Sequence, residues 1–243
     1  MPTASAPLTR CAFLLFAGLL LLAGTGRGLA AETAATGASA RTATATADWR
    51  ATVREFAASH FRHPAWGYSH SQRDYELAAE LAREDHATLD DDVLYAAAFL
   101  HDIAAFPPWA DPKVDHADAA ARIVDTVLRD TDFPAAKLDA VRGAIRTHMY
   151  DREPVGPEAL YLHDADSLDW LGAIGVARLF ATVDAGGGMP DGPTIAHGLE
   201  DLLAKVPARI LTPAGRARLE ARRAELARFL AELKRESRDF ATL

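Results

Sequence analysis

Cysteine and aromatic residues are scarce in this chain, and the alternation of apolar and polar residues that is typical of β-strands is missing. The one cysteine, Cys11, lies near the N-terminus, so the rest of the chain has no thiol with which to form a disulfide. Aromatic residues make up 8% of the sequence, whereas alanine is abundant, and this balance favours helices. No useful length alternates apolar and polar residues with period two, and no internal repeat is present. The sequence therefore predicts neither a β-sheet nor a disulfide-stabilised fold.

Basic residues are also in short supply. The chain has 26 Lys and Arg against 34 Asp and Glu, which gives a formal net charge of −8. An acidic surface argues against binding to nucleic acid or to anionic membranes. An anionic substrate must then be attracted locally, by a metal ion and nearby basic side chains. The 243 residues, 49% of them hydrophobic and 25% charged, are typical of one globular domain of ordinary size.

The long apolar run from Cys11 to Ala23 is too short to span a bilayer as a mature helix. Arg10 precedes the run, and Gly28-Leu29-Ala30 offers small residues at a cleavage site. We therefore expect a signal peptide over 1–30 and a secreted or periplasmic protein, without stable membrane association after cleavage. An uncleaved N-terminal anchor is the alternative. Cleavage would also remove Cys11. Residues 31–47, rich in Ala, Thr, Gly and Ser, read as a flexible linker.

The segment 48–243 reads as one irregular, all-α multi-helix domain, with Pro and Gly turn signals between periodic segments. Nine helices are predicted, over about 48–61, 71–85, 90–105, 115–129, 134–148, 157–170, 174–184, 194–205 and 212–234. The helices after 194 form a C-terminal part. In the last one, an apolar stripe includes Leu219, Leu226 and Leu230, and it should pack on the domain. A dimer contact through this stripe is the alternative, so the protein is expected to be a monomer or a homodimer.

The pair His101-Asp102 ends the apolar run Val93 to Leu100. Neighbouring side chains on a helix point about 100° apart, so both could reach one ion only if the helix ends there. A neutral imidazole and a carboxylate suit a divalent transition metal. The pair alone occurs by chance in many chains, and its meaning depends on the residues around it.

Further histidines and aspartates lie on neighbouring predicted helices. His70 follows Ser69, which could cap a helix and place His70 in its first turn. His148 extends an apolar stripe at helical spacing, and His116 opens another segment. Asp166 has Leu162 and Trp170 four residues away on either side, so it should face inward. A buried, unpaired carboxylate is costly and therefore needs a partner or a metal ion.

At this point the chain resembles the HD superfamily of metal-dependent phosphohydrolases, over about residues 68–182. The family pattern is a histidine, then a His-Asp pair, then an aspartate, all on helices around one metal ion. The matching residues are His70 in HSQRDYELA, His101-Asp102 in AAAFLHDIAAF, and Asp166 in HDADSLDWLGAIGVAR. Asp166, the aspartate that follows alanine, is the expected ligand, and Asp164 is the alternative.

The resemblance implies a divalent ion, Mn, Fe, Co, Ni or Zn, held by the four matching residues. His116 and His148 match two histidines that some members use for a second ion or for substrate phosphate, with Asp102 bridging the two ions. With one ion, these histidines would instead bind phosphate or protonate the leaving group. Arg73 and Arg146, each close in sequence to a ligand, are candidate phosphate clamps.

The implied activity is hydrolysis of a small phosphoester by metal-activated water, and a nucleotide is one candidate substrate. The chain departs from many members, because Ile103-Ala104-Ala105 stands where they carry Ile-Gly-Lys, and a nearby glutamate of some nucleotidases is missing. These departures leave the substrate and the proton transfer open. Two alternatives therefore stand beside hydrolysis: an HD-type di-iron oxygenase, and a metal-binding module without turnover.

Overall fold

The computed structural model describes residues 48–183 and 191–243. The predicted signal peptide and linker lie outside these ranges. Within them the chain forms helices joined by loops and no strand, as the sequence predicts. None of the described helices is long and apolar enough to cross a membrane.

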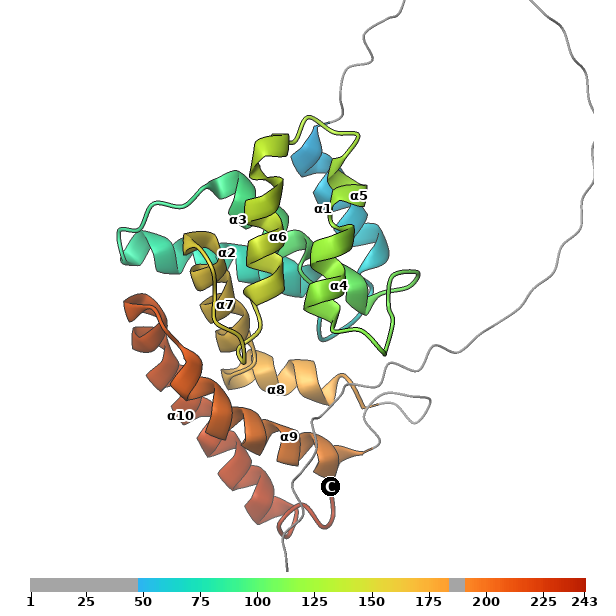
Figure 1. Cartoon of the computed structure of the whole chain (residues 1–243). Coiled ribbons are helices and arrows are strands. Elements are labelled where there is room, and N and C mark those ends of the chain that lie inside the picture. The colour runs from blue at the N-terminus through green and yellow to red at the C-terminus, as the bar shows by residue number, and fades with distance from the viewer. Residues whose placement is uncertain (1–47, 184–190) are drawn as a thin grey trace, which may run out of the picture.

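Ten α-helices, with short 3₁₀ turns between some of them, make up the described part of the chain (Figure 1). They are α1 (Trp49–His60), α2 (Tyr68–Glu84), α3 (Asp91–Leu100), α4 (His116–Ile123), α5 (Asp125–Leu128), α6 (Leu138–Thr147), α7 (Pro157–Asp169), α8 (Gly172–Phe180), α9 (Gly192–Lys205) and α10 (Pro213–Glu236).

The helices form two groups that meet at α2 and α7. Helices α1 and α3 to α6 pack together on one side, with α3 against α1, α2 and α6. Helices α8, α9 and α10 pack against one another on the other side, and α10 also contacts α7 and α2 (Figure 1). Helix α7 therefore lies between the groups, and its inward-facing side chains are shielded from water on both sides.

Helix α3 is the most deeply buried element of the first group. Every residue from Val93 to Leu100 is buried, because this helix is apolar on all faces. Asp90 caps its start by accepting hydrogen bonds from the backbone N–H groups of Asp92 and Val93. The helix ends at Leu100 and a 3₁₀ turn follows at Ile103–Ala105, so the His101-Asp102 pair lies in a change of backbone direction.

Several boundaries differ from the sequence prediction, and the helix predicted over 90–105 already ends at Leu100. Helix α2 begins at Tyr68 rather than at residue 71, because the loop before it folds back and Tyr68 N–H donates to Phe61 O. Its N-cap is therefore Gly67, not Ser69, and a Cβ at Gly67 would lie 2.3 Å from His63 O. The predicted helix over 115–129 is broken between α4 and α5, and the one over 134–148 starts with a 3₁₀ turn.

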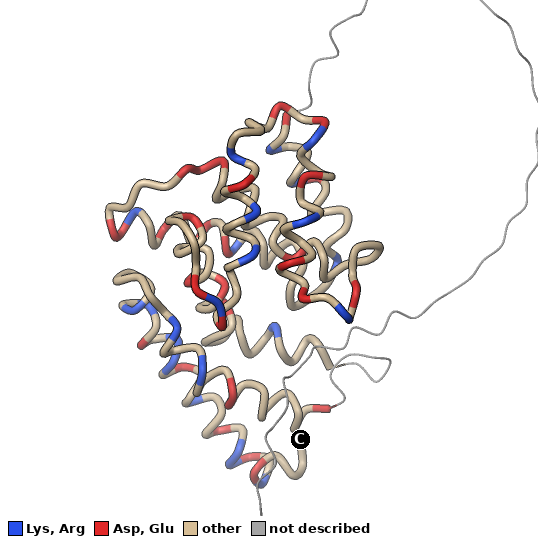
Figure 2. The backbone as a smooth tube through the Cα atoms, viewed as in Figure 1, with Lys and Arg blue, Asp and Glu red and all other residues tan. Residues whose placement is uncertain are grey.

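The apolar stripe of α10 packs on the domain. Leu219, Leu226 and Leu230 are buried, while the rest of the helix carries interleaved acidic and basic residues (Figure 2). Asp164, buried on α7, fixes the start of α10 by accepting hydrogen bonds from Leu211 N–H and from the N–H and Oγ1–H of Thr212. The carboxylate of Asp164, the alternative ligand of the sequence analysis, is therefore engaged in hydrogen bonds that hold the start of α10.

Candidate metal centre

His70 lies in the first turn of α2 and is buried. Its Nδ1 lies 3.0 Å from Asp169 Oδ2 and 3.1 Å from Asp74 Oδ2, and both atoms are acceptors. Nδ1 therefore carries the hydrogen of the neutral ring, which leaves a lone pair on Nε2. A carboxylate behind a ligating histidine commonly fixes its tautomer and orientation in this way.

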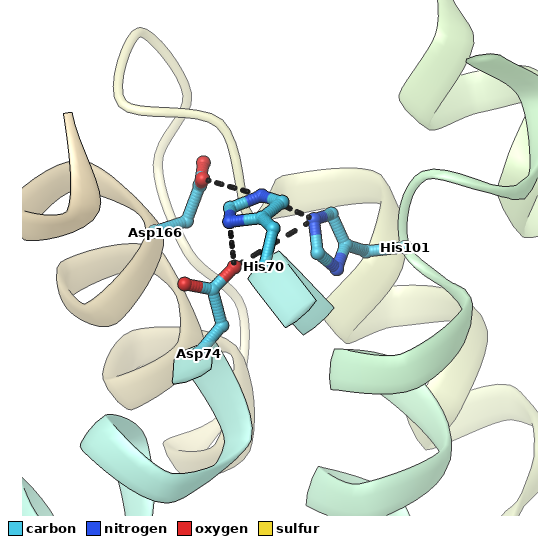
Figure 3. Close-up of side chains that lie close together, drawn as sticks. All are labelled: His70, Asp74, His101 and Asp166. Atoms are coloured by element: carbon cyan, nitrogen blue, oxygen red, sulfur yellow. Dashed lines mark hydrogen bonds and ion pairs between the residues drawn. The ribbon is translucent and has the colours of Figure 1, made fainter. Parts of the chain in front are cut away.

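His101 lies at the C-terminal end of α3 with the same tautomer preference. Its Nδ1 donates to Ala98 O at 2.8 Å, so the Nε2 atom faces His70 Nε2 at 3.3 Å. Figure 3 shows the two rings with these nitrogen atoms toward each other. Two lone pairs at this separation repel unless positive charge lies between them. The gap therefore attracts a proton or a metal ion.

Two carboxylates complete the surroundings of this gap. Asp166 Oδ1 lies 3.4 Å from His70 Nε2, while Asp102 Oδ2 lies 3.3 Å from His101 Nε2 and 3.7 Å from His70 Nε2. Around an ion with bonds of about 2.1 Å, adjacent ligand atoms lie roughly 3.0 to 3.4 Å apart. The four predicted residues therefore fit a site of two nitrogen and two oxygen ligands, a donor set that suits a divalent transition metal.

Asp74 joins this cluster, although the sequence analysis did not single it out. One ligand atom each from His70, Asp74, His101 and Asp166 lies within 4.8 Å of the others (Figure 3). Asp74 is fully buried, and neither of its oxygens accepts a hydrogen bond, although His70 Nδ1 lies 3.1 Å from Oδ2. Burial raises the pKa of the Asp74 carboxyl, and the charge of Asp169 raises it further. Such an orphaned carboxyl beside two imidazoles is a second sign that the site accepts a cation.

Asp169 supports His70 from behind and is itself held by two arginines. Arg73 donates to it through Nε at 3.0 Å and Nη2 at 2.8 Å, and Arg178 Nη1 donates at 3.0 Å. Burial alone would raise the pKa of Asp169, but the hydrogen bonds from His70 and Arg73 hold it below its usual range. Asp169 is therefore ionised and fixes the ring of His70.

The predicted phosphate clamps lie outside the cluster. Arg73 is engaged in its two-point contact with Asp169. Arg146 has a half-exposed side chain, and its Nε lies 3.7 Å from Asp118 Oδ1. A substrate-binding role for either arginine stays a prediction.

His116 and His148 lie on the other side of Asp102. His116 Nε2 is 3.6 Å from Asp102 Oδ1, while the other oxygen of Asp102 faces His70 and His101. His148 is buried and its Nδ1 donates to Ile145 O at 2.6 Å, so its Nε2 is unprotonated. A ligand atom of His148 lies within 4.8 Å of ligand atoms of His101 and Asp102. Asp102 therefore stands between two groups of histidines, as a bridging carboxylate would.

The pKa values show how the cluster balances its charge without a metal ion. Burial would lower the pKa of His101, but the charge of Asp102, Asp74 and Asp166 raises it to about 10. Burial would raise the pKa of Asp102, and the charge of His101 keeps it well below its usual range. Burial lowers the pKa values of His70 and His148. At neutral pH the imidazoles of His70 and His148 are neutral, and the extra proton on His101 serves as the local positive charge.

The comparison with known families bears on these residues directly. The family model described as HD domain matches residues 67–171, a range that holds all four predicted ligands. Over residues 67–171 the chain is thus similar to an HD domain. The match covers less than half of the chain, and it includes helices α2 to α7. No curated protein matches the chain.

Solved structures extend the likeness of this chain to known proteins beyond this range. A predicted HD superfamily hydrolase from an uncultured Thermotogales bacterium is 28% identical, with a TM-score of 0.54 over 77% of this chain and 90% of that one. A Lactobacillus plantarum protein is 23% identical, with a TM-score of 0.60 over 77% and 96%. Bacillus subtilis YpgQ, solved in complex with ADP, is 22% identical, with a TM-score of 0.56 over 77% and 97%. The last two matches show a shared fold.

Proposed function

We propose that this protein is a metal-dependent phosphohydrolase that acts on a small phosphoester. The observation that carries the proposal is the pair of Nε2 atoms, from His70 and His101, facing each other at 3.3 Å between the carboxylates of Asp102 and Asp166. Hydrolases of the HD superfamily among its structural neighbours support an enzyme rather than a binding module.

A divalent ion in this position would lower the pKa of a water molecule and neutralise phosphoryl charge. His70, His101, Asp102 and Asp166 would hold the ion, and Asp169 keeps the Nε2 atom of His70 available to it. His148 can only accept at Nε2, because its Nδ1–H is bonded to Ile145 O. His116 is partly exposed and has no such restriction, so it is the histidine that we assign to the leaving group.

A nucleotide is the first substrate to test. YpgQ, which has the same fold, was solved with ADP, and this supports including nucleoside diphosphates among the candidates. The acidic balance of the chain means that the phosphate must be attracted by the ion and by nearby basic groups. Asp102 is only 7% exposed, and this burial favours the end of a substrate over an internal position of a polymer.

The test is metal-dependent turnover of a panel of phosphomonoesters and nucleotides by the purified protein. Activity should require Mn, Fe, Co, Ni or Zn and should disappear in a His101→Ala/Asp102→Ala variant. His197→Ala is a matched control, because His197 is an exposed histidine whose ion pair with Glu200 lies in α9. Absence of hydrolysis across the panel with a fully metal-loaded protein would contradict the proposal.

A di-iron oxygenase is a second candidate, and the position of Asp102 favours it specifically. Its two oxygens face separate groups of histidines, with Oδ1 3.6 Å from His116 Nε2 and Oδ2 3.3 Å from His101 Nε2. This arrangement suits two ions bridged by one carboxylate. Two irons per chain together with oxygen-dependent turnover would favour this candidate over hydrolysis.

A further inference from the structure

Arg178 is a deeply buried arginine that neither the sequence analysis nor the proposed reaction uses. It lies on α8, outside the residues that match the HD domain, and it is 3% exposed. Its guanidinium carbon lies 3.9 Å from the centre of the Trp170 ring. A buried cation needs several acceptors, and their positions show what Arg178 can do.

Two hydrogen bonds and the Trp170 ring fix the guanidinium plane. Nε donates to Ala65 O at 2.5 Å, and Nη1 donates to Asp169 Oδ2 at 3.0 Å. These contacts connect α8 with the loop before α2 and with the end of α7. They account for the structural role of Arg178 without involving Nη2.

The remaining nitrogen, Nη2, lies 3.2 Å from His70 Nε2. This is the atom that the four-residue site offers to a metal ion, because Nδ1 of the same ring is engaged by Asp169. One lone pair cannot serve both a metal ion and an N–H donor. When a cation takes His70 Nε2, the Nη2 hydrogen of Arg178 loses its acceptor while the other two contacts keep the group in place.

The Nη2 hydrogen of Arg178 then needs a new acceptor in the space beside His70 Nε2. Two carboxylate oxygens lie close to that nitrogen, Asp166 Oδ1 at 3.4 Å and Asp102 Oδ2 at 3.7 Å, and both belong to the predicted ligand set. A phosphoryl oxygen of the substrate would supply an unused acceptor with negative charge. A guanidinium N–H aimed at an oxyanion in a site without bulk water makes a strong hydrogen bond.

We propose that Arg178 binds the phosphoryl group of the substrate through Nη2 and releases His70 Nε2 when the metal ion binds. This inference rests on the proposed phosphohydrolase function and names the phosphate-binding residue of that same site. Arg73 differs from Arg178 because all of its contacts with the cluster are made to Asp169.

The experiment measures two affinities of the full-length protein, with Co²⁺ and inorganic phosphate as the probes. Co²⁺ affinity is measured by calorimetry, and phosphate affinity of the Co²⁺-loaded protein is followed through the visible spectrum of the ion. Arg178→Gln should bind phosphate about ten- to a hundredfold more weakly, the loss expected for a hydrogen bond to a charged group. It should bind Co²⁺ more tightly, because Nη2 no longer competes for His70 Nε2.

Arg73→Gln is the matched control, since it also removes a cationic partner of Asp169 but leaves Nη2 of Arg178 in place. Its effect on phosphate affinity should be much smaller, because Arg73 is engaged with Asp169, and this result would also argue against the phosphate-binding role that the sequence predicts for Arg73. Equal effects of the two variants, or a loss of both affinities in Arg178→Gln, would overturn the inference, because Arg178 would then act only through the fold. If Arg178→Gln does not fold, Arg178→Lys replaces it, with the same opposite changes expected.

Failure of the proposed function would look different. Wild-type protein that binds Co²⁺ without binding phosphate would contradict a phosphoester substrate and the phosphate-binding role of Arg178 together. The competition for His70 Nε2 would still be tested by Co²⁺ affinity, which must rise in Arg178→Gln and not in Arg73→Gln. Weak phosphate binding in Arg178→Gln alone would support both the proposed function and the phosphate-binding role of Arg178.

Discussion

Proton and metal ion should compete for the same place in this cluster, and the competition can be followed by changing pH. The pKa of His101 is raised from its usual 6.5 to about 10 by Asp102, Asp74 and Asp166, so the metal-free protein carries a proton there at neutral pH. A ligating histidine must be neutral. Binding of a divalent ion at pH 7 to 8 should therefore release about one proton from His101.

The sign and size of the effect on stability follow from the same shift. Because the folded-state pKa is above the unfolded one, the stabilisation by this proton is complete below pH 6.5 and is lost as pH rises to about 10. Within that window the free energy of unfolding of the metal-free protein should fall by up to about 1.4 kcal/mol per pH unit. The metal-loaded protein has already lost the proton, so the contribution of His101 to this slope should vanish.

The assay has two parts that use the same purified protein. Urea unfolding of the metal-free and Zn²⁺-loaded forms between pH 6.5 and 10 gives the two slopes. Calorimetry at pH 7.5 in buffers of different ionisation enthalpy counts the protons released on Zn²⁺ binding. Equal slopes for the two forms together with no proton release would refute the assignment of the proton and the ion to one place.

Three further predictions concern single residues. Asp74→Asn should weaken metal binding about ten- to a hundredfold, as loss of a supporting carboxylate does, and calorimetry would show an unchanged affinity if Asp74 has no part in the site. Gly67→Ala should lower stability by about 2 kcal/mol or more, because its Cβ would lie 2.3 Å from His63 O, and a wild-type urea midpoint would contradict that close approach. Leu94→Ala, at a fully packed position of α3, should cost about 2 to 5 kcal/mol in the same assay, whereas a cost below 1 kcal/mol would argue against the packing described for α3.

Helices were predictable from the sequence wherever apolar periodicity and turn residues agree. The run Val93 to Leu100 fixes α3, and Pro157 marks the start of α7. The break near Val124 was missed because no glycine or proline marks it in the sequence. The early start of α2 depends on a backbone contact between Tyr68 and Phe61, which local propensity does not encode.

For the candidate site, the sequence predicted four residues that the structure places close together, but it did not predict the residues that support them. His70, His101, Asp102 and Asp166 follow a spacing that resembles a family, and the structure brings their side chains together. Asp74 could have been found as the residue one helical turn after His70. Arg178 could not, because it reaches His70 from a position 108 residues away in the sequence.

The most direct test of the metal centre is elemental analysis of the purified protein beside the His101→Ala/Asp102→Ala variant, with His197→Ala as the control. The account predicts one or two transition-metal ions per chain in the wild type and in the control, and little in the double variant. Metal absent from a metal-supplemented wild-type preparation, or equally present in the double variant, would contradict the assignment of these residues as ligands.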